Sequence, residues 1–262
     1  MTKNIIMMDT YKILTSKLFF ISILGVAVFC FVSVHQDIPI THLHETTVIN
    51  MIDLLFCLSM FKKILIIFAS IPIVAIFCTD WIYQYIRPVI MRGGIKRYIW
   101  TKIFICQLAS FFVVFIGMFL FVFVMSCFSP LADSDVNAYV GWEAFESLLL
   151  NKQNFLYLFL NIFIFSLGIS FWVVLGMTIS AYIPNQFVAI ISPFIVAYLL
   201  EEFTSLMPLS INLFYLTRVQ FDTGNGNIIT FLYYIFIFEL LIILSGFLFS
   251  YQVKRRIRNE IV

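Results

Sequence analysis

Long apolar runs separated by short polar segments make up the pattern along this chain. A transmembrane helix needs about 20 mainly apolar residues, and runs near that length recur from one end of the sequence to the other. We predict an all-α polytopic membrane protein, built as a single transmembrane domain over residues 1–262. Its six expected spans lie near residues 18–34, 64–77, 100–125, 155–181, 187–203 and 228–251.

Composition supports lipid as the solvent of this chain. Hydrophobic residues make up 62% and charged residues 11%, whereas a soluble domain is about half apolar and about a quarter charged. The chain is also too apolar and too weakly charged to be disordered. A net charge of +2 provides no broad basic surface for nucleic acid, so we expect no nucleic-acid partner.

Charge placement predicts the orientation, because Lys and Arg favour cytoplasmic segments. If both termini are cytoplasmic, 12 of the 16 Lys and Arg residues fall inside and ten of the 14 Asp and Glu residues fall outside. The four basic residues that fall outside are Lys62, Lys63, Lys152 and Arg218, and this topology places Lys62 and Lys63 at the outer interface. No small-x-small cleavage site follows the first span, so we expect an uncleaved anchor in the cytoplasmic membrane.

The segment before the first span has the periodicity of a short helix. Its apolar residues follow i, i+4, i+7, i+11 spacing: Met7, Tyr11, Leu14 and Leu18. Its polar residues lie on the opposite side: Asp9, Lys12 and Ser16. This pattern predicts an amphipathic helix over residues 1–17 at the inner membrane face. The alternative is an ordinary frayed segment leading into the span.

The loop after the second span predicts a second amphipathic helix. Its apolar side comprises Trp81, Ile82, Tyr85, Ile86, Val89 and Ile90. The other side comprises Asp80, Gln84, Arg87 and Met91. Asp80 is a suitable N-cap, Pro88 should bend the helix, and Gly93-Gly94 should end it. Either this loop only sets the topology or its helix docks a cytosolic partner.

The segment between the fifth and sixth spans, residues 201–216, is too apolar for a solvated loop. It predicts a re-entrant or interfacial hairpin, which is allowed where protein buries the backbone. The sequence Gly224-Asn225-Gly226 then marks a turn into the last span.

Familiar catalytic motifs are missing from the sequence. The chain has no G-x-x-x-x-G-K-[ST] loop, no H-E-x-x-H and no G-x-S-x-G, so an enzyme is the least favoured class. His42 and His44, with His35, Asp37 and Glu45 nearby, are suitable metal ligands. Their spacing does not match a closed four-ligand site, and we expect no metal. The five cysteines form no C-x-x-C pair and are expected to pack as small apolar residues.

Glu239 lies near the middle of the last predicted span, where a carboxylate is costly and marks a functional or interhelical site. Gln107 and Asn161 are candidate hydrogen-bonding partners on other spans. A structural role and a role in transport both remain open for this polar group.

The chain resembles the ABC-two permeases, the membrane subunits of type V ABC transporters. The resemblance rests on the N-terminal helix, the hairpin containing Pro208, and a docking helix followed by Gly93-Gly94-x-Lys96-Arg97-Tyr98-x-x-x-Lys102. It implies a separate P-loop ATPase subunit carrying ATP and Mg²⁺, with no cofactor in this chain. It also implies a second permease, either a copy or a paralogue. The implied ATPase-facing residues are Asp80, Gln84, Arg87 and Met91, and Pro88 departs from the family pattern.

The resemblance further implies a bacterial exporter, and the lack of a polar cluster in the spans favours a hydrophobic or amphipathic substrate such as a peptide, a bacteriocin or a drug-like molecule. The alternative is a membrane immunity or scaffold protein that acts alone, without transport.

Overall fold

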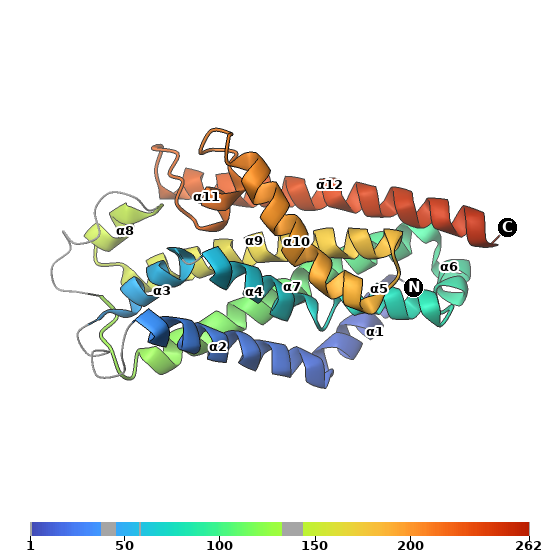
Figure 1. The fold of residues 1–262 in the computed structure, drawn as a ribbon, viewed down its shortest axis with the longest axis horizontal. Coiled ribbons are helices and arrows are strands. Elements are labelled where there is room, and N and C mark those ends of the chain that lie inside the picture. The colour runs from blue at the N-terminus through green and yellow to red at the C-terminus, as the bar shows by residue number, and fades with distance from the viewer. Residues whose placement is uncertain (1, 38–45, 58, 133–143, 262) are drawn as a thin grey trace.

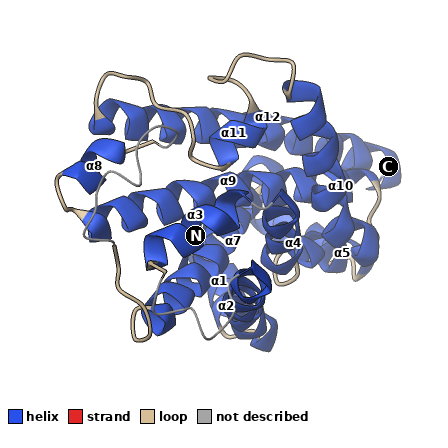
Figure 2. Cartoon of the chain, turned by 60° about the vertical axis from the view of Figure 1, so that its left-hand side comes forward, coloured by secondary structure: helices blue, strands red, loops and turns tan. Residues whose placement is uncertain are grey.

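The computed structural model describes residues 2–37, 46–57, 59–132 and 144–261. In these ranges the chain forms helices and loops and no strand (Figure 2). Five helices are long and apolar enough to cross a membrane: α2 (Lys17–Asp37), α7 (Ile95–Met125), α9 (Asn154–Tyr182), α10 (Gln186–Thr204) and α12 (Asn227–Ile261). The expectation of an all-α, multi-pass membrane protein is therefore confirmed.

Shorter helices lie between the long ones and at the ends of the bundle. They are α1 (Thr2–Leu14), α3 (Val48–Cys57), α4 (Ser59–Ser70), α5 (Val74–Ile82), α6 (Ile86–Gly93), α8 (Glu146–Leu150) and α11 (Leu213–Thr217).

Helix α9 is the central element of the bundle. It packs against α7, α10 and α12, and also against α4 and α5. Its most apolar stretch is 78% buried inside the protein, whereas the corresponding stretch of α12 is only 28% buried. The outward side of α12 is apolar, with exposed residues such as Leu232, Phe236 and Phe247. Such a surface suits a lipid environment.

The path of the chain brings its two ends together. It runs along the bundle in alternating directions through α2, the α4–α5 pair, α7, α9, α10 and α12 (Figure 1). Both chain ends and α6 lie at one end of the bundle, which we call the terminal end. Helices α3, α8 and α11 lie at the opposite end, which we call the distal end.

The segment predicted as the second span is divided into α4 and α5. The helix stops at Ser70 and restarts at Val74, with Pro72 between them, because proline lacks the N–H that an uninterrupted helix needs. The Ser70 hydroxyl lies 2.8 Å from the carbonyl of Ile67 and 3.2 Å from that of Ile190 in α10. The contact with Ile190 joins the end of α4 to α10 beside the break.

Helix α1 occupies the segment in which the sequence predicts a short helix. The apolar stripe of Met7, Tyr11 and Leu14 is exposed. Asp9 and Ile13, on the opposite side, are buried, and the helix packs against α7. The polar side of α1 therefore faces protein at Asp9, whereas its apolar stripe remains available to a membrane surface.

Close packing of α9 on α10 predicts a cost for added volume at Gly176. A Cβ atom built there lies 2.5 Å from Cγ of Pro193, a rigid ring. Gly176→Ala should therefore lower the thermal unfolding temperature, because overpacking costs about 1–3 kcal/mol. Gly246→Ala is the matched control, since its Cβ meets the flexible end of Ile103 at 3.1 Å. Equal unfolding temperatures for the two variants would contradict this packing.

Candidate functional site

The segment predicted as one docking helix is folded as two helices joined by a turn. Helix α5 ends at Ile82, Gln84 adopts a left-handed φ of 57°, and α6 begins at Ile86. Pro88 lies in the first turn of α6, where no intrahelical N–H is required. The chain therefore bends at Gln84 and not at Pro88. Gly94, with φ of 77°, ends α6 at the predicted position.

The predicted docking residues do not share one exposed face. Gln84 is exposed and Met91 is 85% exposed. Asp80 instead turns into the protein, where it contacts Tyr98 and Lys102 of α7. The side chain of Arg87 lies outside the described part of the structure. The contacts of Asp80 therefore hold the end of α5 against α7. The exposed surface of this segment begins after Asp80.

Lys102 lies at the centre of a buried charge cluster at the terminal end. Its Nζ is 2.8 Å from Oδ2 of Asp9 in α1 and 2.8 Å from Oδ2 of Asp80 in α5. The Tyr98 hydroxyl donates a hydrogen bond of 3.2 Å to the same Asp80 oxygen. The Lys102 side chain is only 8% exposed. One lysine therefore ties three helices together.

This arrangement is costly to break. Burying a charge without a partner costs several kcal/mol, and close ion pairs with additional hydrogen bonds offset that cost. The sequence predicts Asp9 on the polar side of the N-terminal helix. In the structure Asp9 is buried, because it finds its partner, Lys102, on another helix.

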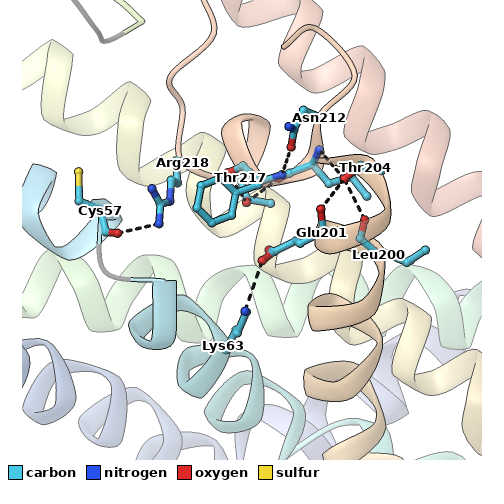
Figure 3. A network of polar contacts seen from close by, with 10 residues as sticks. Cys57, Lys63, Leu200, Glu201, Thr204, Asn212, Thr217 and Arg218 are labelled. Atoms are coloured by element: carbon cyan, nitrogen blue, oxygen red, sulfur yellow. Dashed lines mark hydrogen bonds and ion pairs between the residues drawn. The ribbon is translucent and has the colours of Figure 1, made fainter. Parts of the chain in front are cut away.

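A second buried pair connects α4 with α10 (Figure 3). Nζ of Lys63 lies 3.8 Å from Oε2 of Glu201, and the two side chains are 8% and 3% exposed. The same ammonium lies 4.2 Å from the centre of the Tyr198 ring, a favourable cation–π distance. The sequence predicts Lys63 at the outer interface. The structure adds that its side chain is buried between α4 and α10, where Glu201 and Tyr198 stabilise its charge.

In the segment after α10, side chains form hydrogen bonds with backbone groups (Figure 3). The Thr204 hydroxyl accepts from the Leu213 amide at 3.3 Å, and Asn212 Oδ1 accepts from the Phe214 amide at 2.9 Å. Arg218 donates to the carbonyl of Cys57 at 2.6 Å and lies 3.7 Å from the Phe214 ring. These contacts satisfy backbone groups in an apolar segment, which is what the predicted hairpin requires.

The structure brings together two of the three polar residues predicted inside the spans. Gln107 Nε2 in α7 donates a hydrogen bond of 2.5 Å to Oε1 of Glu239 in α12. Asn161 in α9 is buried, and its Nδ2 has no hydrogen-bond partner among the described residues. The Gln107–Glu239 contact joins α7 and α12 directly.

Metal ligation has no support in the described ranges. No group of three His, Cys, Asp or Glu side chains gathers there, while His42, His44 and Glu45 lie outside those ranges. Cys30, Cys78 and Cys106 are buried, and Cys57 and Cys127 are exposed. Among the described residues these cysteines form no disulfide.

Comparison of the chain with models of protein families, with curated proteins and with solved structures finds no match.

The charge cluster predicts that Lys102→Met destabilises the protein. Asp9 and Asp80 would lose their shared cation, and breaking a buried ion pair costs about 3–5 kcal/mol. The unfolding temperature in detergent should fall, and adding Asp9→Asn with Asp80→Asn should recover part of the loss. Lys96→Met, at an exposed lysine on the same helix, is the control. An unchanged unfolding temperature for Lys102→Met would rule out the cluster.

The Gln107–Glu239 bond predicts different results for two substitutions at one position. Glu239→Gln keeps an acceptor for Gln107, so stability should be preserved. Glu239→Leu leaves Gln107 without this partner and should cost about 1–3 kcal/mol. Thermal unfolding in detergent checks both variants, with Glu202→Leu at an exposed position as the control. Equal unfolding temperatures for Glu239→Gln and Glu239→Leu would contradict a structural role of this bond.

Proposed function

We propose that this chain is the permease subunit of an ATP-driven exporter in the cytoplasmic membrane of a bacterium. In this proposal a separate P-loop ATPase supplies the energy, and a second permease, either a copy or a paralogue, completes the pathway. Both termini are cytoplasmic, and the spans are α2, the α4–α5 pair, α7, α9, α10 and α12. The alternating path of these elements, with both chain ends at the terminal end, supports this topology (Figure 1).

The α4–α5 pair serves as the second crossing. Helix α4 has 12 residues and α5 has nine. At about 1.5 Å per residue, neither reaches across a hydrocarbon core of about 30 Å, but the two in sequence approach that length. The buried Lys63–Glu201 pair and the contact of the Ser70 hydroxyl with the Ile190 carbonyl join α4 to α10. Protein therefore packs beside the break, as irregular backbone in lipid requires.

Helix α6 is the observation on which the proposal mainly rests. It is a short helix at the terminal end, it packs on α7, and it buries Ile86 while exposing Met91. The Lys102 cluster fixes the chain just before it, at Asp80. A helix whose start is fixed by buried contacts and whose outer side is exposed suits docking of a rigid cytosolic partner. We assign Gln84, Arg87 and Met91 to the ATPase-facing surface, with Asp80 positioning it.

The substrate is proposed to be hydrophobic or amphipathic, for example a peptide, a bacteriocin or a drug-like molecule. Charged and amide groups along the bundle are largely engaged with one another, as in the Lys63–Glu201 and Gln107–Glu239 contacts. Few strong polar groups therefore remain to bind a small ion or a polysaccharide. Apolar faces on α10 and α12 provide the surfaces on which lipid or the second permease would pack.

Copurification tests the proposal directly. The tagged protein is isolated from its native membrane, and mass spectrometry identifies the cytosolic proteins retained with it. We expect a P-loop ATPase, whose retention falls about tenfold in Arg87→Glu and Met91→Glu, since loss of an interface hot spot costs more than about 1.4 kcal/mol. Asn225→Glu places the same charge at an exposed site near the distal end and should bind normally.

Two results would count against the proposal. If the correctly inserted Arg87→Glu and Met91→Glu variants retain the ATPase fully, α6 is not the contact. If the wild-type chain retains no ATPase, a stand-alone immunity or scaffold protein becomes the better explanation.

A further inference from the structure

A cleft of about 580 Å³ opens at the terminal end, beside the Lys102 cluster. Helix α1, the start of α2, the α4–α5 break and the turn after α5 enclose it. A smaller cavity of about 240 Å³ shares Lys12, Asp80 and Tyr85 with it and reaches Lys102 itself. Ligand sites commonly have volumes of about 300–1,000 Å³, so the larger cleft has room for a small molecule or a lipid headgroup.

The lining of the larger cleft changes from polar to apolar. Lys12, Thr79, Asp80 and Tyr83 contribute polar groups, whereas Leu18 and Pro72 contribute apolar surface. Leu18 belongs to the first turn of α2, the first candidate span. A cleft at the beginning of a span lies at the depth of lipid headgroups, where tyrosine side chains are also favoured. Both its chemistry and its depth therefore match an amphiphile.

The charges lining this cleft have opposite signs and sum to zero. Lys12 is exposed and makes no ion pair with another described residue. Asp80 uses Oδ2 for its contacts with both Lys102 and Tyr98, which leaves Oδ1 as an acceptor. An anionic headgroup would be attracted by Lys12 and repelled by Asp80. A headgroup that carries both signs would satisfy both residues.

We propose that this cleft, lined by Lys12, Leu18, Pro72, Thr79, Asp80 and Tyr83, binds the headgroup of a zwitterionic phospholipid. The phosphate pairs with Lys12, and the ammonium end lies against Asp80 and Tyr83. The acyl chains begin along Leu18 and Pro72. A primary ammonium would donate hydrogen bonds to the carboxylate, whereas a trimethylammonium would rest on the tyrosine ring. This site needs only a membrane and does not depend on an ATPase.

Native mass spectrometry of the full-length protein in detergent tests the proposal. The protein is incubated with an equimolar mixture of chain-matched phosphatidylethanolamine, phosphatidylcholine and phosphatidylglycerol. We expect wild type to retain one of the two zwitterionic lipids about tenfold more than phosphatidylglycerol, and Lys12→Glu to retain that lipid about tenfold less than wild type does, because its phosphate loses one charge-assisted contact. Lys96→Glu, an exposed lysine outside the cleft at the same end, should behave like wild type.

Each outcome decides the assignment. Preference for phosphatidylethanolamine supports contact of the ammonium with Asp80, and preference for phosphatidylcholine supports contact with Tyr83. Preference for phosphatidylglycerol, or equal retention of all three lipids, overturns the proposal. A Lys12→Glu protein that retains the zwitterionic lipid at the wild-type level also overturns it, because the lipid would then lie elsewhere. Lys12 is exposed, so Lys12→Glu should leave the fold intact, and thermal unfolding checks this. A loss of lipid retention in the folded variant therefore reports on binding.

Discussion

Pairing of buried charges is the constraint on which this structure depends. Burying a charge in protein without a partner costs several kcal/mol, so every ionisable group buried in the bundle needs a partner. Lys102 meets that need with Asp9 and Asp80, and Lys63 meets it with Glu201. The contacts that neutralise these charges also join different helices. The Lys102 cluster fixes how α1, α5 and α7 lie against one another, and the Lys63–Glu201 pair does the same for α4 and α10.

Fixing α5 at Asp80 has a consequence for the terminal end. The chain leaves this anchored point, turns at Gln84 and forms α6, so α6 is held at a defined place although its outer surface is exposed. The same anchor forms one wall of the cleft that we assign to a phospholipid headgroup. A docking surface and a lipid site would then share Asp80, one on each side of the turn. This proximity provides a physical route by which lipid bound in the cleft influences α6.

The sequence predicted most of the long helices because their signal is local. The apolar runs that form α2, α7, α9, α10 and α12 can be recognised without reference to distant parts of the chain. The end of α6 at Gly94 can be predicted because glycine readily adopts the backbone conformation that ends a helix. The division of the second span at Pro72 also had a local signal, the proline itself. Hydropathy averages over the whole segment and does not show the break, and the contact of Ser70 with Ile190 beside it joins residues that are distant in the sequence.

Partners across helices could not be predicted in the same way. Asp80 was assigned to an exposed surface because helical periodicity shows which residues share a side, not what that side faces. Lys63 was assigned to the outer interface from the topology, and its partner Glu201 is distant in the sequence. One signal was present: Asp9 and Asp80 are acids in segments that are otherwise basic. Asp9, Asp80 and Lys102 were therefore candidates for a buried charge cluster. Gln107 and Glu239 were predicted as partners because a polar residue within a span finds few other groups with which to form a hydrogen bond.

Orientation can be measured without changing the protein. Cys127 is exposed and follows α7 at the distal end, whereas Cys30, Cys78 and Cys106 are buried and act as internal controls. A membrane-impermeant maleimide is applied to intact cells, and the modified cysteines are identified by mass spectrometry. If both termini and α6 are cytoplasmic, Cys127 should be modified from outside while the buried thiols remain unmodified. Modification of Cys127 only from the cytoplasmic side, in inverted vesicles, would contradict this orientation and with it the placement of α6 beside a cytosolic ATPase.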